Sequence, residues 1–578
     1  MEKKNLQIER IVEYSDIFND ESKPRLEDLI QGIDRKHLCI LLSNMSSRLV
    51  GRPFFDNDFS IQNGEFDCMR FFLSKKDPNF FGHVYMKFLE LVKQNRDNGF
   101  EGRFVASGMS TVMLFQRYVF ALEPCLNKFS IHTEQNIFKA YLLLNEKVLK
   151  ACFKQDKNNI PLDLSLAEMY LAYNYANEDV EATDYNDAFR RQFIKSICLF
   201  EYLFRDKRLK GIRKSFLSHY HLSGWFEYWA YHIHFLNCIK YKSGVLDFSE
   251  NSRIPKKVKK FIKKMSISLN TILPYDKNSD YIFFRSKPFI QIGKNEFAIT
   301  NVTFLIEHLY NSLYFDLKSN RKESGFISDD EFRSYWTSEF AQKYMFHRFV
   351  RGCLHGNELV VLDGCECDSI VQKNNLTGVN PPDFYIRTPD CCLLFEFKDT
   401  LLSAKIKDER NSEKFFKELE KKFVKNNEGK PKGIAQLMIN AKAIQDNAFV
   451  FDKVRSDIPI IPVLVVDNLT YTMRGMRTKL EYMKKDYCVQ NKIDTKTICP
   501  LILVDVATFR LHQDYIANKG FYKVFSEYYA ETLFSSNMDF ESIMYTMNSF
   551  TEYMKAKPIS NLDSVIERIV TYNKSYFS

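Results

Sequence analysis

The strongest constraint on how this chain can fold is the segment 381–400, whose sequence is PPDFYIRTPDCCLLFEFKDT. Two runs rich in apolar residues, 383–387 and 391–398, flank a short turn that has Pro389 followed by Asp390 at its centre. Proline followed by aspartate favours a type I turn, so we expect the two runs to be the strands of an antiparallel hairpin. The segment therefore predicts a pair of strands whose register is set by the turn.

The register of this hairpin decides which side chains share a face. If Thr388 and Cys391 face each other, Asp383 lies directly opposite Glu396, with the two Cβ atoms roughly 5 Å apart. Lys398 shares their face because strand side chains alternate with period 2. The opposite face carries only apolar side chains, namely Phe384, Ile386, Leu393, Phe395 and Phe397. The hairpin thus predicts one face for a core and one face with two carboxylates and an ammonium group.

Two neighbouring carboxylates on a half-buried sheet need a partner. They repel each other unless a proton or a cation relieves them. Mg²⁺ and other hard divalent cations take oxygen ligands, often one or two carboxylates together with a substrate phosphate. A cation held in this way can polarise a phosphodiester and activate water for in-line attack. Asp383 and Glu396 are therefore candidate ligands of a divalent cation, with Lys398 beside them.

The residues Pro382-Asp383, followed by Glu396-Phe397-Lys398, resemble the signature of the PD-(D/E)XK nuclease superfamily. The resemblance covers residues 327–510 and implies a restriction-endonuclease-like core, in which a mixed central sheet is flanked by helices. It implies that Asp383 and Glu396 are metal ligands together with the backbone carbonyl of Phe397, and that Lys398 is the catalytic lysine. The implied cofactor is Mg²⁺ or Mn²⁺, and the implied reaction is hydrolysis of nucleic acid.

The core of that family runs helix, three strands, helix, strand, and the segment before the hairpin predicts the first helix. Ser328 and Glu331 form a capping-box pattern. Four aromatic residues then recur at every fourth position, namely Phe332, Trp336, Phe340 and Tyr344. Glu339 lies beside this stripe, and the resemblance makes it a candidate for a further metal ligand. The alternative is a solvated glutamate on the flank of a helix.

The segments on either side of the hairpin complete the expected order. Residues 357–363 predict a first strand, and residues 433–447 predict an amphipathic helix. On that helix the resemblance assigns Gln436 to contact with the attacking water or the scissile phosphate, and the alternative is an ordinary surface amide. The nearly all-apolar runs 458–467 and 500–505 predict buried parallel strands.

Other groups of metal-binding residue types have a less suitable spacing. They are a Cys-x-His and Cys-x-Cys group, Cys353, His355, Cys365 and Cys367, and a histidine group, His219, His221, His232 and His234. Structural zinc sites usually separate paired ligands by two to four residues, so we expect reduced thiols and packed histidines here, with zinc as the alternative. The basic run 253–264 is typical of a solvated helix face, with phosphate binding as the alternative.

The composition indicates an intracellular protein. The chain has 578 residues, a net charge of +9 and thirteen scattered cysteines, and it opens with the polar sequence MEKKNLQIER. Scattered cysteines without a signal peptide favour free thiols in a reducing compartment. No apolar run is long enough to span a bilayer. We therefore expect a cytoplasmic protein that has no membrane partner.

The expected organisation is a multidomain α+β chain in four parts. Residues 1–250 predict a mainly helical module that recognises a substrate, a trigger, a protein partner or a second copy of the chain. Residues 251–326 predict a small mixed α/β connector, 327–510 the nuclease core, and 511–578 a helical extension. The polar segment 318–325 is the clearest predicted linker.

The sequence favours a metal-dependent nuclease that acts on DNA in preference to RNA and that cuts as an endonuclease. A nuclease core that is attached to a long helical module and has no P-loop of its own is similar to prokaryotic restriction and anti-phage defence effectors. The alternative is a catalytically silent protein of the same fold that binds nucleic acid or protein partners.

Overall fold

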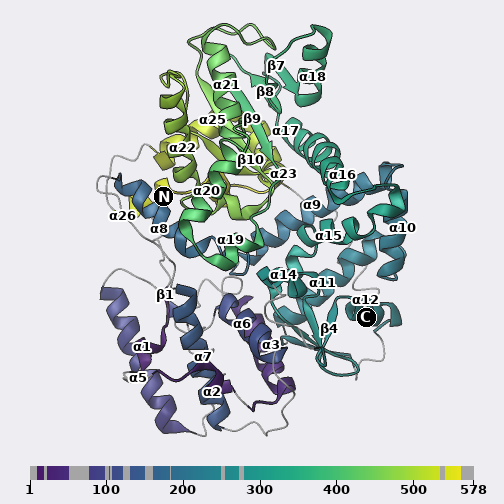
Figure 1. The fold of residues 1–578 in the computed structure, drawn as a ribbon, viewed down its shortest axis with the longest axis vertical. Helices are drawn as coiled ribbons and strands as arrows, with labels where there is room; N and C mark the ends of the chain where they lie inside the picture. Colours follow the sequence, from purple (N-terminus) through teal and green to yellow (C-terminus); the bar gives the residue numbers. More distant parts are fainter. Residues whose placement is uncertain are drawn as a thin grey trace.

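Two β-sheets organise the described part of the chain, and helices surround both of them (Figure 1). The computed structural model describes residues 10–18, 23–30, 32–50, 77–97, 103–104, 107–120, 131–149, 160–181, 184–241, 243–248, 254–271, 279–533 and 540–560. One sheet has five strands and the other has four, and a short parallel pair joins β1 (Arg10–Ile11) to β2 (Arg103–Phe104). The α+β class that the sequence predicts is confirmed.

The five-stranded sheet contains the predicted hairpin and has the strand order β11-β10-β9-β8-β7. Its strands are β7 (Val360–Asp363), β8 (Phe384–Arg387), β9 (Cys392–Lys398), β10 (Ile460–Val466) and β11 (Ile502–Asp505). The neighbours β7, β8 and β9 are antiparallel, whereas β9, β10 and β11 run parallel to one another. Each strand lies within a range predicted from the sequence and is shorter than that range by a few residues.

The hairpin has the register that the turn predicts. Strands β8 and β9 pair from Phe384 opposite Phe395 to Arg387 opposite Cys392. Across the turn, the backbone N–H of Thr388 donates a hydrogen bond to the carbonyl of Cys391 at 2.9 Å. Asp383 comes directly before β8, so one further step of the same register brings it opposite Glu396.

Both faces of the five-stranded sheet are buried. The predicted apolar face joins a large core with α23 (Val506–Leu511) and α25 (Phe521–Tyr528). The second face carries Tyr385 and Leu394 beneath three helices, α20 (Ser412–Phe423), α21 (Ile434–Gln445) and α22 (Met476–Gln490). The sequence predicts apolar residues on one face only, whereas in the structure apolar residues also surround the charged groups on the second face.

A long helical segment precedes β7 and consists of three parts. These are α16 (Asp329–Tyr335), a π-helical stretch (Trp336–Phe346) and α17 (His347–Arg351). The segment begins at its predicted cap, where Ser328 Oγ accepts a hydrogen bond from the Glu331 N–H at 3.0 Å. An apolar stripe that repeats every four residues drifts around an α-helix of 3.6 residues per turn, and the wider π turns reduce this drift.

The amino-terminal part is mainly helical, as the sequence predicts (Figure 1). Its helices are α1 (Tyr14–Ile17), α2 (Leu26–Ile30), α3 (Arg35–Val50), α5 (Pro78–Asp97), α6 (Gly108–Leu114), α7 (Ile131–Leu149), α8 (Leu162–Asn174), α9 (Tyr185–Arg205), α10 (Lys210–His219) and α11 (Trp225–Tyr241). Helices α2, α3, α5, α6 and α7 share a buried core with strands of the second sheet.

The second sheet has the order β3-β6-β5-β4 and crosses the predicted boundary at residue 250. Its strand β3 (Val245–Asp247) lies in the range predicted as the helical module. The elements of the predicted connector are α12 (Lys256–Lys264), β4 (Ser266–Ser268), α13 (Ile282–Ser286), β5 (Phe289–Gln291), β6 (Glu296–Ile299), α14 (Val302–Glu307) and α15 (Asn311–Ser319). Strands β5 and β6 form an antiparallel hairpin. Helices α14 and α15 are separate because Tyr310, between them, leaves the helical conformation, with φ −142° and ψ −60°.

The polar segment 318–325 is packed against α10. Ser324 Oγ accepts a hydrogen bond from the Ile212 N–H at 3.0 Å, and Ser215 Oγ donates to the side-chain oxygen of Asn320 at 2.7 Å. A residue larger than Gly211 would place its Cβ against the backbone of Glu323. The segment predicted to be a linker is therefore held to the helical part by close contacts.

Helix α9 joins the helical part to the five-stranded sheet. One continuous hydrophobic core contains residues of α9, α11, the segment 329–351 and the sheet. Arg191 and Lys195 of α9 are fully buried and pair with Asp505 at the carboxyl end of β11, at 3.1 and 2.8 Å. Lys195 also pairs with Asp467, directly after β10, at 3.0 Å.

The chain after β11 is helical in its described part. Besides α23 and α25, it forms α24 (Gln513–Lys519), α26 (Phe540–Thr546) and α27 (Phe550–Met554). Residues 561–578 of the predicted helical extension lie outside the described residues. Among the helices that the structure describes, none combines the length and the apolar character that a membrane crossing requires.

Candidate metal-binding and catalytic site

Four of the residues selected from the sequence converge between β9 and α21. Asp383 lies directly before β8, Glu396 and Lys398 share one face of β9, and Gln436 is in the first turn of α21. Lys398 Nζ lies 2.5 Å from Glu396 Oε1 and donates to Gln436 Oε1 at 3.0 Å. The lysine therefore links the glutamate on the strand to the amide on the helix.

The Asp383 carboxylate is fixed from two sides. Its Oδ2 accepts a hydrogen bond from the Phe397 backbone N–H, and its Oδ1 accepts one from Gln342 Nε2, both at 2.7 Å. Its backbone carbonyl accepts a hydrogen bond from the Gly364 N–H at 2.9 Å. These contacts aim the carboxylate towards β9, and each of its oxygens keeps a further lone pair for another partner.

Glu396 is the most strongly perturbed group of the site. Its side chain is 1% exposed, and its Oε2 has no hydrogen-bond partner among the described residues. Burial, and then the neighbouring Asp383 carboxylate, raise the pKa of Glu396 to about 8, although Lys398 opposes the rise. Burial also raises the pKa of Asp383, again against the effect of Lys398. Without a cation, the pair favours holding a proton at neutral pH.

Lys398 remains a cation in this environment. Burial lowers the pKa of its ammonium group, but Glu396 and Asp383 outweigh burial and raise it overall. The side chain is held between the Glu396 carboxylate and the Gln436 amide oxygen. The site thus holds one ammonium group beside two carboxylates, so a further positive charge would still be favourable there.

Gln436 is oriented by the start of its own helix. Its Oε1 accepts a second hydrogen bond from the Gly433 N–H at 2.9 Å. Gly433 has φ +40°, and a Cβ at this position would lie 3.1 Å from the Phe423 carbonyl oxygen. Glycine therefore suits a turn that brings the amide oxygen of Gln436 to Lys398.

Glu339 does not join these groups. Its carboxylate is 39% exposed and pairs with Lys343 at 2.7 Å, one turn further along the same helical segment. Gln342 instead reaches the site, through Asp383. Gln342 was not predicted because the resemblance implies a carboxylate on this segment, and no local signal in the sequence marks an amide there. The backbone of Phe397 meets Asp383 through its N–H, and a metal-ligand role for its carbonyl remains a prediction.

The two weaker groups of metal-binding residue types do not assemble as such. Cys353 Sγ donates to the Phe509 carbonyl at 3.2 Å, and His355 lies against the Ala517 carbonyl. Burial lowers the pKa of His232 to about 3, and its ring contacts the Tyr228 carbonyl at 2.8 Å. In the described part of the chain, one group of three potential metal ligands has its ligand atoms close together, and this group contains Cys365 but none of the other seven residues.

The converging groups suit a hard divalent cation. Two carboxylates present oxygen atoms in a buried space, and one of these oxygens has no partner. Mg²⁺ and Mn²⁺ prefer such oxygen ligands. A cation at this position would satisfy the free Glu396 oxygen and offset the repulsion between Asp383 and Glu396. Lys398 would then lie beside any phosphate that the cation binds.

Comparison with known proteins assigns no family to this chain. No family model, no curated protein and no solved structure matches it. The chemistry of the site therefore has to be inferred from its residues and their geometry.

Proposed function

We propose that this protein is a metal-dependent nuclease that hydrolyses phosphodiester bonds in nucleic acid, with DNA as its substrate and internal cleavage as its mode. Residues 327–510 would form a restriction-endonuclease-like core with Mg²⁺ or Mn²⁺ as the cofactor. A role in prokaryotic restriction or anti-phage defence would fit the attachment of such a core to a large helical part.

The order of elements supports this proposal. A helical segment, 329–351, is followed by the three antiparallel strands β7, β8 and β9, with α18 (Gly364–Lys373) between β7 and β8. Helices α19 (Ala404–Glu409), α20 and α21 and the parallel strand β10 come next. Apart from the inserted helices α18, α19 and α20, this is the helix, three strands, helix, strand order that the motif implies. The candidate residues lie directly before the second strand, on the third strand and on α21.

The observation that carries the proposal is the buried carboxylate pair. Glu396 keeps one oxygen without a partner at a position where Asp383 repels its charge. Leaving a buried polar group unsatisfied costs about 1–3 kcal/mol, and more when the group is charged. A packed core has no use for this arrangement, whereas a divalent cation would stabilise it directly.

Each residue has a role in the proposed reaction. When bound, the cation would polarise the phosphate and lower the pKa of a water molecule that it binds. Asp383, held by Phe397 and Gln342, and Glu396 bind and orient it. Lys398 is placed to stabilise the charge that develops on the phosphate oxygens, because its ammonium group is anchored on both sides. Gln436 orients the lysine through the hydrogen bond between Lys398 Nζ and Gln436 Oε1.

Cleavage assays with an isosteric variant test the proposal. The full chain would be incubated with circular plasmid, single-stranded DNA and RNA, in Mg²⁺, in Mn²⁺ or in chelator. We expect metal-dependent cleavage of the plasmid that Asp383→Asn abolishes and that Glu428→Gln, a change at an exposed glutamate in a loop, leaves intact. Asparagine keeps an oxygen acceptor for the Phe397 N–H, so the fold should survive.

Three other results would count against the proposed nuclease activity or against the metal site. Cleavage that persists in Asp383→Asn would place the activity elsewhere and contradict the proposal. Mn²⁺ binding by calorimetry, without cleavage of any of these substrates, would favour the catalytically silent alternative. Absence of both binding and cleavage would reject the metal site itself.

A further inference from the structure

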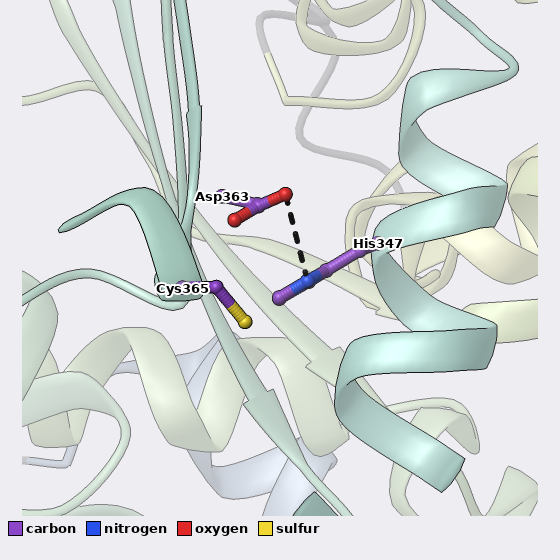
Figure 2. A group of neighbouring side chains, drawn as sticks. All are labelled: His347, Asp363 and Cys365. Carbon is purple, nitrogen blue, oxygen red and sulfur yellow. Dashed lines mark ion pairs between the residues drawn. The ribbon is translucent and has the colours of Figure 1, made fainter. Parts of the chain in front are cut away.

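A second group of ligand atoms lies behind Asp383, on elements that the proposed reaction does not use. His347 is the first residue of α17, Asp363 ends β7, and Cys365 lies in the first turn of α18 (Gly364–Lys373). Their ligand atoms all lie within 4.8 Å of one another. Figure 2 shows the imidazole pointing into the space between the carboxylate and the thiol.

We propose that His347, Asp363 and Cys365 form a second metal site, which binds Zn²⁺ or a similar late first-row divalent cation. This site is separate from the Asp383–Glu396 pair and does not depend on the proposed nuclease activity.

The histidine provides the first argument. His347 is 5% exposed, and its Nε2 has no hydrogen-bond partner among the described residues. Its Nδ1 lies 4.0 Å from Asp363 Oδ2 (Figure 2), which is too long for a hydrogen bond. Burial lowers the pKa of His347, although Asp363 and a hydrogen bond with the Asp383 backbone oppose the effect. Nε2 is thus the ring nitrogen left without a partner in the described part of the chain, and a buried nitrogen of this kind can bind a cation.

The distances provide the second argument. With metal–ligand bonds of zinc, the atoms of a tetrahedral nitrogen, oxygen and sulfur set lie roughly 3.3–3.6 Å apart. The present group is within 4.8 Å, so it needs to close by about 1 Å. Cys365 is exposed, so rotation of its side chain can bring the thiol closer to the other two ligands. The 4.0 Å between His347 Nδ1 and Asp363 Oδ2 also has to shorten when the metal binds.

The ligand types select the metal. Imidazole and thiolate favour zinc and its neighbours over Mg²⁺, which prefers oxygen. Three protein ligands leave a fourth position for water or another small ligand. The thiol loses its proton to solvent when it binds, so binding should weaken as the pH falls.

Arg351 should influence the affinity of this site for a cation. Its Nη2 donates to Asp363 Oδ2 and to Glu366 Oε2, both at 2.7 Å. Although burial opposes it, the hydrogen bond from Arg351 lowers the pKa of Asp363 and keeps the carboxylate ionised. Hydrogen bonds of this kind orient ligating carboxylates. The positive charge also repels a cation, so the arginine should reduce affinity while it holds the ligand in place.

The position of the site connects it to Asp383. Gly364, between the two ligands Asp363 and Cys365, donates its N–H to the Asp383 carbonyl at 2.9 Å. A metal here would tie α17 to the start of α18 and thereby brace the backbone that carries Asp383. The expected effect of the metal is a more stable corner of the sheet.

Cobalt titration tests the site directly. Co²⁺ replaces Zn²⁺ in such sites, and a cysteine ligand gives a thiolate-to-metal charge-transfer band in the near ultraviolet. Full-length protein, stripped with chelator, should show this band with Co²⁺, and added Zn²⁺ should remove it. Cys365→Ser should abolish the band, and the exposed position of this residue means that the variant should fold. Cys499→Ser serves as the matched cysteine control and should keep the band.

Two more variants separate this site from its neighbours. Asp383→Asn should keep the thiolate band, because that carboxylate belongs to the other site. Arg351→Gln should lower the Kd for Co²⁺, because it removes a competing charge. A band of equal strength in wild type and Cys365→Ser, or no band at all, would overturn the proposal.

Discussion

Replacing Glu396 with glutamine should make the metal-free protein more stable at alkaline pH. The glutamate is buried, and one of its oxygens has no partner among the described residues. Its pKa rises from an ordinary value of 4.5 to about 8 because of burial and of Asp383. Glutamine has the size of the protonated acid and carries no charge to bury. Lys398 keeps the Gln436 oxygen as an acceptor in the variant.

The sign and size of the effect follow from proton linkage. Below pH 4.5 the folded and unfolded states both hold the proton, and Glu396 costs nothing. Between pH 4.5 and 8 the folded state holds a proton that the unfolded state has released, so stability falls as the pH rises. Each pKa unit corresponds to about 1.4 kcal/mol, which gives an upper bound on the order of 5 kcal/mol above pH 8.

Unfolding midpoints in chelator between pH 5 and pH 9 measure this effect. A unit of 150–250 residues shifts its midpoint by about 2–4 °C for each kcal/mol. We expect Glu396→Gln to match the wild type at pH 5 and to unfold several degrees higher at pH 8.5. Mg²⁺ should raise the midpoint of the wild type at pH 8.5 and leave that of the variant nearly unchanged.

A matched control tests whether removing any glutamate charge has the same effect on stability. Glu428→Gln changes a glutamate whose side chain is 67% exposed and should follow the wild type at every pH. The reasoning is refuted if the wild type and Glu396→Gln have parallel pH profiles, or if the variant is the less stable protein at pH 8.5. Either result would mean that Glu396 is ionised and adequately partnered without a cation.

Three further substitutions have defined outcomes. Lys398→Met should lower the rate of plasmid cleavage by about 10²–10⁴-fold, while calorimetry still detects Mn²⁺ binding; a rate close to that of the wild type would remove the lysine from the mechanism. Gln342→Leu should weaken Mn²⁺ binding by about 10–100-fold, because Asp383 loses a hydrogen bond that orients it, and unchanged binding would show that this contact is dispensable. Lys195→Met should destabilise the protein by about 3–5 kcal/mol in denaturant unfolding, because Asp505 loses one of its buried partners, whereas a change at an exposed lysine should have little effect.

The hairpin could be predicted from the sequence because its register depends on local chemistry. A four-residue turn and a two-residue alternation are enough to bring Asp383 opposite Glu396, and β8 and β9 pair as those rules require. Gln436 was selected through the family resemblance, and it lies beside Lys398 in the structure because Gly433, three residues earlier, starts its helix. Short-range rules thus account for Asp383, Glu396 and Lys398, and the resemblance accounts for Gln436.

The remaining features depend on information that single segments do not contain. Glu339 was selected because the resemblance implies a carboxylate on this helical segment, but the π-helical stretch presents Gln342 to the site instead. The second buried face of the sheet arises from α20, α21 and α22, which sequence periodicity could locate along the chain but could not place in space. His347 and Asp363 are brought together by the packing of α17 beside β7, and neither belongs to a recognisable spacing pattern.

Helix α9 has a consequence for how the chain is made. Its Arg191 and Lys195 leave the ribosome roughly three hundred residues before Asp505, the acidic group that they neutralise in the finished sheet. Until synthesis reaches that aspartate, the edge strand and these two cations cannot come together, and a fragment that lacks Asp505 would bury Arg191 and Lys195 with one acidic partner fewer each. If the protein cuts DNA, the sheet that carries the proposed cutting residues therefore receives its edge strand and this neutralising carboxylate long after the helix that needs them.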